Sequence, residues 1–211
     1  MSTPVAAVVL VHGLWMHGLV FCAHQHWLRA DGFSVRRFSY PSLRGGLDDN
    51  VRTLAGYIRE TRGEVVHLVG HSLGGLLALQ AVAQRADVRL GRVVLLGSPC
   101  AGSHCAVTLA GTPLLASIVG RTMQDWLRGA RPILPPAVEI GVIAGTCSIG
   151  LGRLIPGLAQ PNDGAVALAE TVLPEAKEHI TLNVSHSGML VSRACAVQTA
   201  HFLRTGRFVD A

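Results

Sequence analysis

The segment at residues 65–81, VVHLVGHSLGGLLALQA, places the strongest constraint on how this chain can fold. Residues 65–69 are mostly β-branched or aliphatic, which is typical of a buried strand, and residues 73–85 have a helical pattern. Between them stand Gly70, Ser72 and Gly74 in the pattern Gly-x-Ser-x-Gly. Such a turn is very tight, because a Cβ atom on either glycine would collide with the neighbouring strand or helix. The segment therefore predicts a strained turn that projects the Ser72 hydroxyl above a sheet.

Strand-like and helix-like segments alternate along the rest of the chain. Short apolar runs are expected to be strands at residues 5–11, 33–40, 65–69, 93–97, 138–144 and 180–184. Helical patterns occupy residues 18–31, 48–61, 73–85 and 188–203. This alternation is typical of βαβ units with right-handed crossovers. We therefore expect an α/β fold in which about six parallel strands are covered by helices on both faces.

Residues 103–135 interrupt this alternation. Residues 102–120 contain no Asp, Glu, Lys or Arg, which raises the question of a membrane span. A spanning helix needs about 20 predominantly apolar residues, and Gly111, Pro113 and the interspersed Thr and Ser make this stretch a poor candidate. We expect an irregular helical insertion that forms a small cap, and no transmembrane segment.

Composition limits the class of protein. A chain of 211 residues that is 49% hydrophobic can form one domain with a sizeable core, so we expect a single domain over residues 1–211. The net charge of +5 would suit a nucleic-acid partner, but the arginines are scattered and no basic run of five residues occurs. Nucleic-acid binding is therefore not expected.

The N-terminus and the cysteines bear on localisation. The apolar run near the N-terminus lacks a preceding positive charge and a small-residue cleavage site, unlike a signal peptide. Five cysteines, an odd number without regular spacing, indicate reduced thiols. We expect a cytoplasmic protein, and a Cys100–Cys105 disulfide stays open as an alternative.

Ser72 is the candidate nucleophile. In a doubly wound sheet, functional residues collect at the carboxyl ends of the strands, and Ser72 follows the third expected strand. It also stands at a helix N-terminus, where backbone N–H groups face developing negative charge. The alternatives are a plain glycine-rich turn and a phosphate-binding loop. The latter would need Gly-x-Gly-x-x-Gly or a Gly-Lys-Ser/Thr ending, and neither is present.

A serine nucleophile needs a base. His186 directly follows the last expected strand, which places it at the same edge of the sheet as Ser72. Other histidines are expected in the core or on the surface, namely His67, His179 and His201. Three further histidines are candidate metal ligands, namely His17, His24 and His26. Their spacing fits no zinc pattern. We expect no metal and no cofactor.

Asp163 is the candidate acid that orients the base. It lies in an Asn-Asp-Gly turn between the fifth and sixth expected strands. The chain order Ser, Asp, His matches the order expected for this architecture. An ordinary turn is the alternative. The glutamates further along are expected to be solvated: Glu170, Glu175 and Glu178.

Two backbone amides are the candidate donors of an oxyanion hole. Leu73 follows the nucleophile, and Gly13 lets the loop after the first strand bend so that Leu14 presents its amide. Trp15 and Met16 continue this loop. They are candidate substrate-binding residues, and core packing is the alternative for both.

Five motifs together resemble a known family. In chain order they are VVLVHGLW, LVGHSLGG, GSPCAGS, NDGAV and SHSGMLVS. They are similar to the α/β-hydrolase superfamily, in particular its bacterial lipase and esterase branch. The resemblance implies a minimal α/β-hydrolase fold of about six strands with residues 103–135 as the cap. It also implies Ser72 as nucleophile, His186 as base and then acid, Asp163 as its orienter, and the Leu14 and Leu73 amides as the oxyanion hole.

The sequence departs from this branch at two places. Calcium-binding relatives have an acidic residue soon after the histidine, whereas Ser187 and Gly188 follow here, so no calcium is expected. Cys100 and Ala101 occupy the middle of the GSPxxGS motif, where a histidine and a basic residue are common. The second departure bears on the substrate rather than on the chemistry.

The expected activity is hydrolysis of a small-molecule or lipid ester through an acyl-enzyme. Short and medium acyl chains are expected, because the insertion leaves room for only a modest cap. Residues 103–135 are also a candidate surface for contact with a membrane or a lipid. A thioesterase, a phospholipid or acyl-lipid hydrolase, and a lyase or perhydrolase with the same triad are alternatives, because a fold does not determine function. A non-enzymatic ligand receptor would have a broken triad, whereas all three candidates are present.

Overall fold

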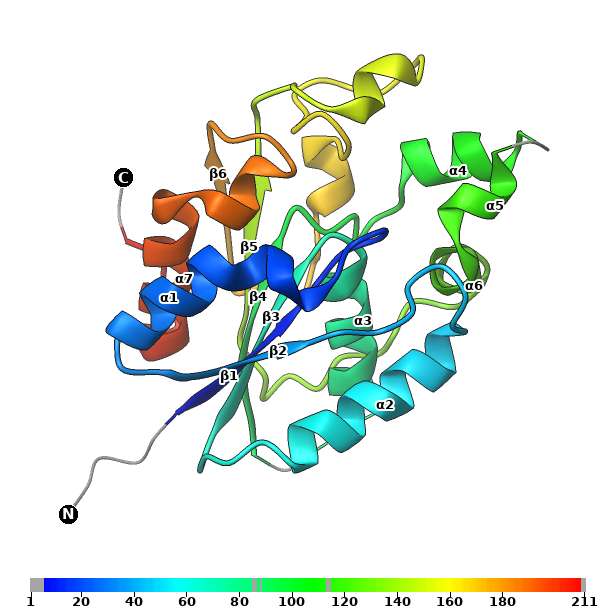
Figure 1. The fold of residues 1–211 in the computed structure, drawn as a ribbon. Coiled ribbons are helices and arrows are strands. Elements are labelled where there is room, and N and C mark those ends of the chain that lie inside the picture. Colours follow the sequence, from blue (N-terminus) through cyan, green and yellow to red (C-terminus); the bar gives the residue numbers. More distant parts are fainter. Residues whose placement is uncertain (1–5, 85–86, 88, 113–114, 210–211) are drawn as a thin grey trace.

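The computed structural model describes residues 6–84, 87, 89–112 and 115–209. Within them, six strands form one parallel sheet in the order β2-β1-β3-β4-β5-β6 (Figure 1). The strands are β1 Ala7–Val11, β2 Ser34–Phe38, β3 Val66–His71, β4 Leu90–Leu96, β5 Ile140–Gly145 and β6 Glu178–Leu182. The strand order reverses at β1 and β3, and α/β sheets bind ligands at such a reversal. The predicted parallel sheet is confirmed.

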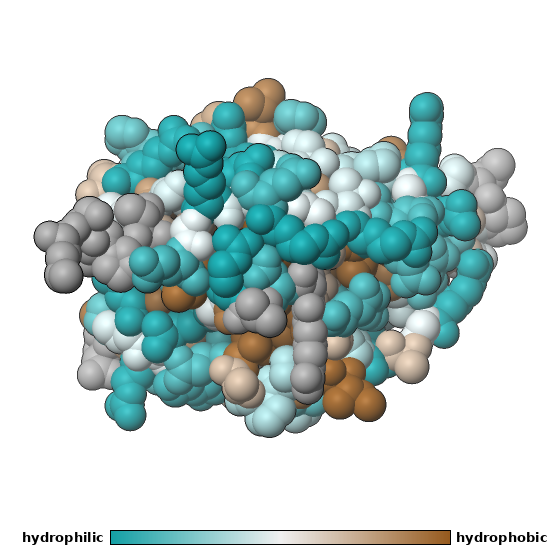
Figure 2. Space-filling model, turned by 90° about the horizontal axis from the view of Figure 1, so that it is seen from below, coloured by the Kyte–Doolittle hydropathy of each residue, from teal (hydrophilic) through white to brown (hydrophobic). Residues whose placement is uncertain are grey.

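Helices cover both faces of the sheet (Figure 1). They are α1 Cys22–Ala30, α2 Leu47–Arg59, α3 Leu73–Ala83 and α7 Arg193–Thr205. Helices α1 and α7 lie on one face and α2 and α3 on the other. The surface below the amino ends of the strands is mostly hydrophilic (Figure 2). None of the helices in the described part of the chain is long and apolar enough to cross a membrane.

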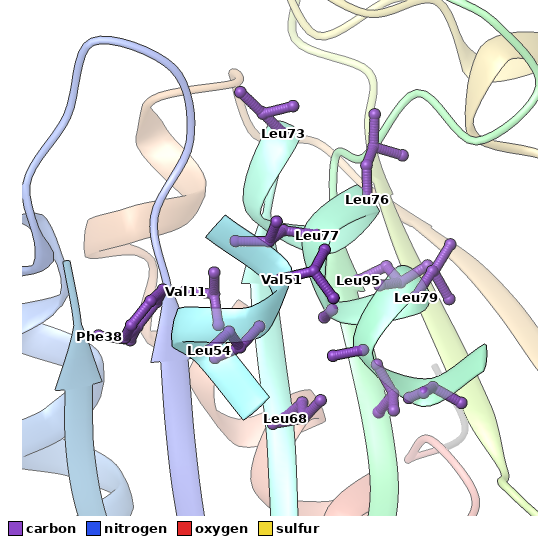
Figure 3. Packing of buried hydrophobic residues seen from close by; sticks show 14 of the residues in the cluster. Val11, Phe38, Val51, Leu54, Leu68, Leu73, Leu76, Leu77, Leu79 and Leu95 are labelled. Carbon is purple, nitrogen blue, oxygen red and sulfur yellow. The ribbon is translucent and has the colours of Figure 1, made fainter. Parts of the chain in front are cut away.

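The two faces of β1 show why its sequence is apolar throughout. Val9 and Val11 belong to the cluster that α2 and α3 bury, which includes Leu54 and Leu77 (Figure 3). Val8 and Leu10, which alternate with them along the strand, pack toward α1 and α7 instead. Because both faces of a parallel strand are covered, every residue of β1 is fully buried.

Among the described residues, three helices follow β4 in the region where the insertion is expected. They are α4 His104–Ala110, α5 Ala116–Val119 and α6 Arg121–Arg128. We call residues 104–128 the cap segment. Asp125 on α6 accepts a hydrogen bond from the Leu47 amide at 3.1 Å and so caps α2, whose preceding residue is Gly46. A second bond joins the buried Asn50 Nδ2 and Thr122 Oγ1 at 2.8 Å. The cap segment is thereby fixed to α2.

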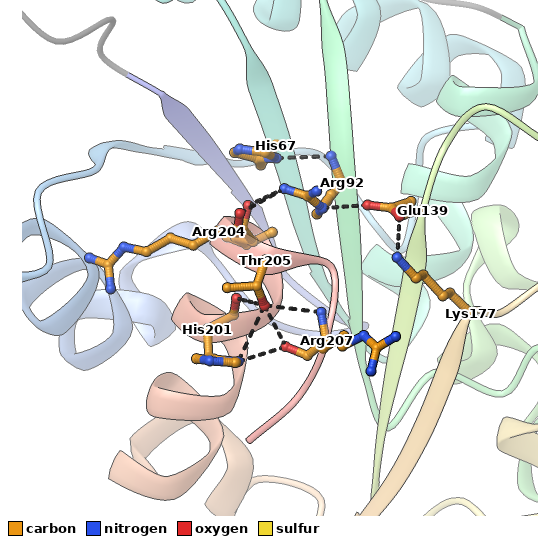
Figure 4. A network of polar contacts seen from close by, with 9 residues as sticks. His67, Arg92, Glu139, Lys177, His201, Arg204, Thr205 and Arg207 are labelled. Carbon is orange, nitrogen blue, oxygen red and sulfur yellow. Dashed lines mark hydrogen bonds and ion pairs between the residues drawn. The ribbon is translucent and has the colours of Figure 1, made fainter. Parts of the chain in front are cut away.

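A polar network joins the amino ends of β3, β4 and β5 to α7 (Figure 4). The Arg92 amide donates to His67 Nδ1 at 2.8 Å, and Arg92 Nε donates to Glu139 at 2.6 Å. Lys177 pairs with the same carboxylate. Arg92 also donates to the main-chain oxygen of Leu203 at 3.0 Å, near the end of α7. The network anchors the closing helix to the sheet.

Several element boundaries differ from those expected. Strand β3 extends to His71, so Ser72 follows it without an intervening residue. The closing helix is divided: a 3₁₀ turn, η4 Gly188–Val191, comes first, and Ser192 then caps α7 by accepting from Cys195 N at 3.3 Å. The expected ends at Val5 and Arg85 lie outside the described residues.

Two smaller elements also differ. The expected helix over residues 18–31 begins as a 3₁₀ turn, η1 Gly18–Phe21. The last strand begins and ends two residues earlier than expected, so His179, which precedes the expected strand, lies inside β6. All five cysteines are free, so the alternative of a Cys100–Cys105 disulfide does not apply.

Candidate active site

Ser72 occupies a strained backbone position between β3 and α3. Its φ of 53° and ψ of −125° place a non-glycine residue on the left-handed side of the map. A Cβ at Gly70 would lie 2.4 Å from the Cα of Gly75, and one at Gly74 would lie 2.2 Å from the main-chain oxygen of Val11. The two glycines are therefore needed because the turn brings backbone directly against backbone.

The Ser72 hydroxyl is not used to cap α3. Serine at this position commonly accepts a hydrogen bond from the second or third amide of its helix, but the Ser72 side chain makes no such bond. The side chain is half-buried and lines a cavity. Its oxygen is thus available to a molecule that enters the cavity.

Asp163 and His186 form a hydrogen-bonded pair. Asp163 Oδ2 lies 2.7 Å from His186 Nδ1. The other carboxylate oxygen accepts from the amides of Ala165 and Val166, at 2.9 and 2.7 Å, and Asp163 is only 1% exposed. A carboxylate oxygen accepts this hydrogen bond from a protonated Nδ1, so the neutral imidazole that makes it has its lone pair on Nε2. This is the tautomer that can take a proton from a hydroxyl.

Glu170 supports the turn that carries Asp163, although it was expected to be solvated; that expectation was wrong. Glu170 is half-buried on a 3₁₀ turn, η3 Leu168–Thr171, and accepts from the Ala167 amide at 2.8 Å. It also accepts from the amide of His104 at the start of α4. The carboxylate therefore joins the Asp163 turn to the cap segment. The Leu-Ala-Glu-Thr sequence is too short to show a periodic pattern, so local sequence alone does not reveal this contact.

Gly97 lies next to the Asp163–His186 pair. The local sequence alone does not mark it as part of the site. It follows β4 with a φ of +56°. A Cβ there would lie 2.9 Å from Asp163 Oδ2 and 3.2 Å from His186 Nδ1. The lack of a side chain at Gly97 lets the carboxylate and the imidazole meet at this position.

His71 is a second buried imidazole beside His186 that the sequence interpretation missed. Its Nε2 donates to the main-chain oxygen of His186 at 2.9 Å, and the two ring centroids are 4.6 Å apart. Its Nδ1 has no hydrogen-bond partner. Burial, and next the neighbouring His186, hold the pKa of His71 well below 6.5. His71 is therefore neutral at pH 7.

His12 orients the loop that follows β1. The Tyr40 amide donates to His12 Nε2 at 3.2 Å, so His12 Nδ1 carries the proton and donates to the Gly13 oxygen at 2.8 Å. In a planar trans peptide the Leu14 N–H points opposite to that oxygen. Neither the Leu14 nor the Leu73 amide bonds an acceptor within the described residues.

One cavity of about 330 Å³ brings the candidates together. Ser72 and His186 both line it, and its walls are largely apolar. From the sheet side it is lined by Leu14, Trp15, Met16 and Leu73, and from the cap segment by Cys105, Ala106, Leu109, Val119 and Met123. Trp15 is half exposed and Met16 half-buried, so neither is a fully buried core residue. Asp163 lies behind His186 and outside the lining.

The remaining histidines do not converge on a metal site. His24 is buried and bonds the main-chain oxygen of Met189 at 2.8 Å, whereas His17 caps η1. Over the described ranges of the chain, no group of three or more His, Cys, Asp or Glu side chains is arranged to hold a metal ion.

Comparison with known proteins gives this geometry a context. Residues 8–177 match the model of the alpha/beta hydrolase family. The chain is 34% identical over 95 residues to the pimeloyl-acyl-carrier-protein methyl ester esterase of Methylococcus capsulatus, which covers 44% of this chain and 37% of that protein. It is 31% identical over 123 residues to the phospholipase YtpA of Bacillus subtilis, covering 51% and 45%. The matches thus span less than half the length of these relatives.

Solved structures are similar over more of the chain. The mature form of the Bacillus licheniformis lipase BlEst2 superposes with a TM-score of 0.75 at 22% identity, covering 98% of this chain and 93% of that one. A metagenomic carboxyl esterase superposes with a TM-score of 0.67 at 18% identity, covering 88% and 66%. At these identities the likeness shows the fold.

Proposed function

The chain belongs to the alpha/beta hydrolase family, and on that premise we propose that it hydrolyses carboxylic esters through an acyl-enzyme formed on Ser72. The observation that carries the proposal is the 2.7 Å bond between Asp163 and His186, with the imidazole on the wall of the cavity that Ser72 also lines. Nucleophilic catalysis by serine needs a base and a group that orients it, and these residues have the required chemistry.

The proposed reaction has two steps. Ser72 Oγ attacks the ester carbonyl while His186 Nε2 takes its proton, and the buried Asp163 carboxylate stabilises the imidazolium. The Leu14 and Leu73 amides donate to the oxyanion. His186 then gives its proton to the alcohol as the alcohol departs. The acyl group remains bound to Ser72 as an ester. Water repeats the sequence, so that the acid is released and the serine is regenerated.

The lining and volume of the cavity favour an ester whose acyl group is apolar and of short to medium length. Leu109, Val119 and Met123 supply apolar side chains from the cap segment. A cavity of about 330 Å³ is at the small end of ligand pockets. We assign the cap role to residues 103–135 and treat residues 1–211 as one hydrolase domain.

An acyl-lipid hydrolase is the second candidate, and a specific observation favours it. Large apolar side chains of the cap segment are exposed, namely Val107, Leu115 and Ile118. Such side chains suit contact with a lipid surface. One curated relative is itself a phospholipase. Thioester hydrolysis would use the same groups, as would a lyase or perhydrolase activity.

An acyl-length panel of p-nitrophenyl esters tests the proposal on wild type and Ser72→Ala. Ser34→Ala is the matched control, because Ser34 is exposed on β2. We expect Ser72→Ala to lose at least about a thousandfold in kcat and Ser34→Ala to retain the wild-type rate. A fluorophosphonate probe should label wild type and not Ser72→Ala. Near wild-type hydrolysis by Ser72→Ala would overturn the proposal.

A further inference from the structure

Trp15 joins the loop after β1 to the cap segment. Its indole Nε1 donates to the main-chain oxygen of Ile118 at 2.6 Å, across 103 positions of the chain. The acceptor belongs to the short helix α5, whose last carbonyls have no helical donor. The indole is 50% exposed, so burial alone does not account for its position.

The backbone at Trp15 is strained. Trp15 and Ser72 are the non-glycine residues with positive φ in the described part of the chain, and the φ of Trp15 is 61°. Such a conformation persists only where surrounding contacts enforce it. The bond to Ile118 is a contact of this kind, because it holds the side chain of Trp15 from outside the loop.

Leu14 is therefore held from both sides. On its amino side, His12 bonds the Gly13 oxygen at 2.8 Å, which orients the Leu14 amide. On its carboxyl side, Trp15 is bonded to α5. The first contact lies within the body of the protein, whereas the second reaches the cap segment. A displacement of α5 would thus be transmitted to the residue next to the candidate oxyanion donor.

The helix that Trp15 binds also contributes to the wall of the cavity. The residue after Ile118 is Val119, which lines the same cavity as Leu14 and Trp15. The bond from Trp15 to Ile118 thus ties the helix that carries Val119 to the loop that carries the Leu14 amide. With the ester carbonyl at Leu14, a longer acyl chain would contact more of the apolar cavity wall than an acetyl group does.

We propose that Trp15 is a specificity-determining clasp, which holds α5 at the distance from the Leu14 amide that suits aliphatic acyl chains of medium length. The proposal rests on the function proposed above, because it assumes that the ester carbonyl is bound at Leu14. Loss of the indole N–H removes the tie between α5 and this loop, while the bonds that hold α6 to α2 remain. A medium chain then loses part of its contact with the apolar wall, whereas an acetyl group loses little.

The test compares p-nitrophenyl acetate with p-nitrophenyl hexanoate in Trp15→Phe, which keeps an aromatic ring and removes the donor. Trp27→Phe on α1 is the matched control, since Trp27 does not line the cavity. We expect the hexanoate-to-acetate ratio of kcat/KM to fall about tenfold in Trp15→Phe, the size of effect that a few apolar contacts provide. The ratio should not change in Trp27→Phe. An unchanged or increased ratio in Trp15→Phe would overturn the clasp.

A second measurement does not depend on turnover. Trypsin can cleave the cap segment after the exposed Arg121 and Arg128. Cleavage there, mapped by mass spectrometry, should be several times faster in Trp15→Phe than in wild type or Trp27→Phe. Equal cleavage rates would contradict the clasp. If wild type shows no Ser72-dependent hydrolysis but the cleavage rates differ, the proposed function fails and the bond between loop and cap stands. If wild type hydrolyses the esters but Trp15→Phe has an unchanged hexanoate-to-acetate ratio and an unchanged cleavage rate, the role proposed for Trp15 fails and the proposed function stands.

Discussion

His71 Nε2 donates a hydrogen bond of 2.9 Å to the main-chain oxygen of His186. The residue that precedes the candidate nucleophile therefore holds the backbone of the candidate base. The two imidazoles are 4.6 Å apart, and His71 is neutral because burial, and then His186, lower its pKa. A neutral ring can lie beside His186 without repelling the imidazolium that the proposed reaction would form there.

The first prediction concerns this contact. His71→Leu removes the donor and leaves the main-chain oxygen of His186 without its buried partner, so we expect kcat to fall about 10- to 100-fold as the base is displaced. KM should change much less. His71→Gln, which can place a donor near the same point, should recover most of the rate. Steady-state kinetics on folded variants checks this, and equal rates in wild type and His71→Leu would contradict it.

The second prediction concerns the acid. Asp163→Asn keeps the size of the side chain, but its amide can donate to His186 and favour the wrong tautomer, so kcat should fall about 10³- to 10⁴-fold. Asp49→Asn is the control, because Asp49 is exposed on α2 and pairs with the exposed Arg52. Both variants should retain the wild-type circular dichroism spectrum. A fall of less than tenfold in Asp163→Asn would argue against its assigned role.

The third prediction concerns two helical glycines. A Cβ at Gly74 would meet the main-chain oxygens of Val11 and His12 at 2.2 and 2.4 Å, so Gly74→Ala should destabilise the fold by about 3 kcal/mol or more. Gly56 lies inside α2, where a Cβ would be 3.9 Å from Arg59 Nη2, an ordinary van der Waals contact. Gly56→Ala should stabilise the fold by about 0.5–1 kcal/mol. Urea unfolding measures both, and the two changes should have opposite signs.

The fourth prediction concerns pH. Burial, and then the neighbouring Arg92, lower the pKa of His67 to about 4. Between this value and about 6.5 the unfolded chain binds a proton that the folded chain does not, so the free energy of unfolding falls as the pH decreases through this range.

His67→Asn isolates this contribution. The Asn oxygen can accept from the Arg92 amide as Nδ1 does, at 2.8 Å in the wild type, and it does not titrate. Between pH 6 and pH 5, wild type should lose up to about 1.4 kcal/mol more than His67→Asn. Urea unfolding at the two pH values gives the difference. Equal losses in the two proteins would show that His67 is protonated equally in both states.

Much of the fold is predictable from local sequence. The apolar run of β1 and the alternation of strands with helices follow from burial on both faces and from periodicity, which neighbouring residues encode. Boundaries were less accurate, as at β3 and β6, because a strand ends where its partner strands and covering helices end. Ser72 and His186 are predictable because each follows a strand, and the carboxyl ends of parallel strands meet at one edge. Asp163 is predicted from the chain order Ser, Asp, His.

The sequence by itself determined the kind of sheet, the tight turn at Ser72 and which residues could carry the chemistry. Only the tertiary structure decided what surrounds them: Gly97 under the Asp163–His186 pair, His71 against the backbone of His186, and Trp15 bonded to Ile118. Gly97 is 66 and 89 positions from the two residues of the pair, His71 is 115 positions from His186, and Trp15 is 103 positions from Ile118. The physical reason is that periodicity and turn geometry depend on adjacent residues, whereas close contacts across a sheet depend on how the packed elements are placed.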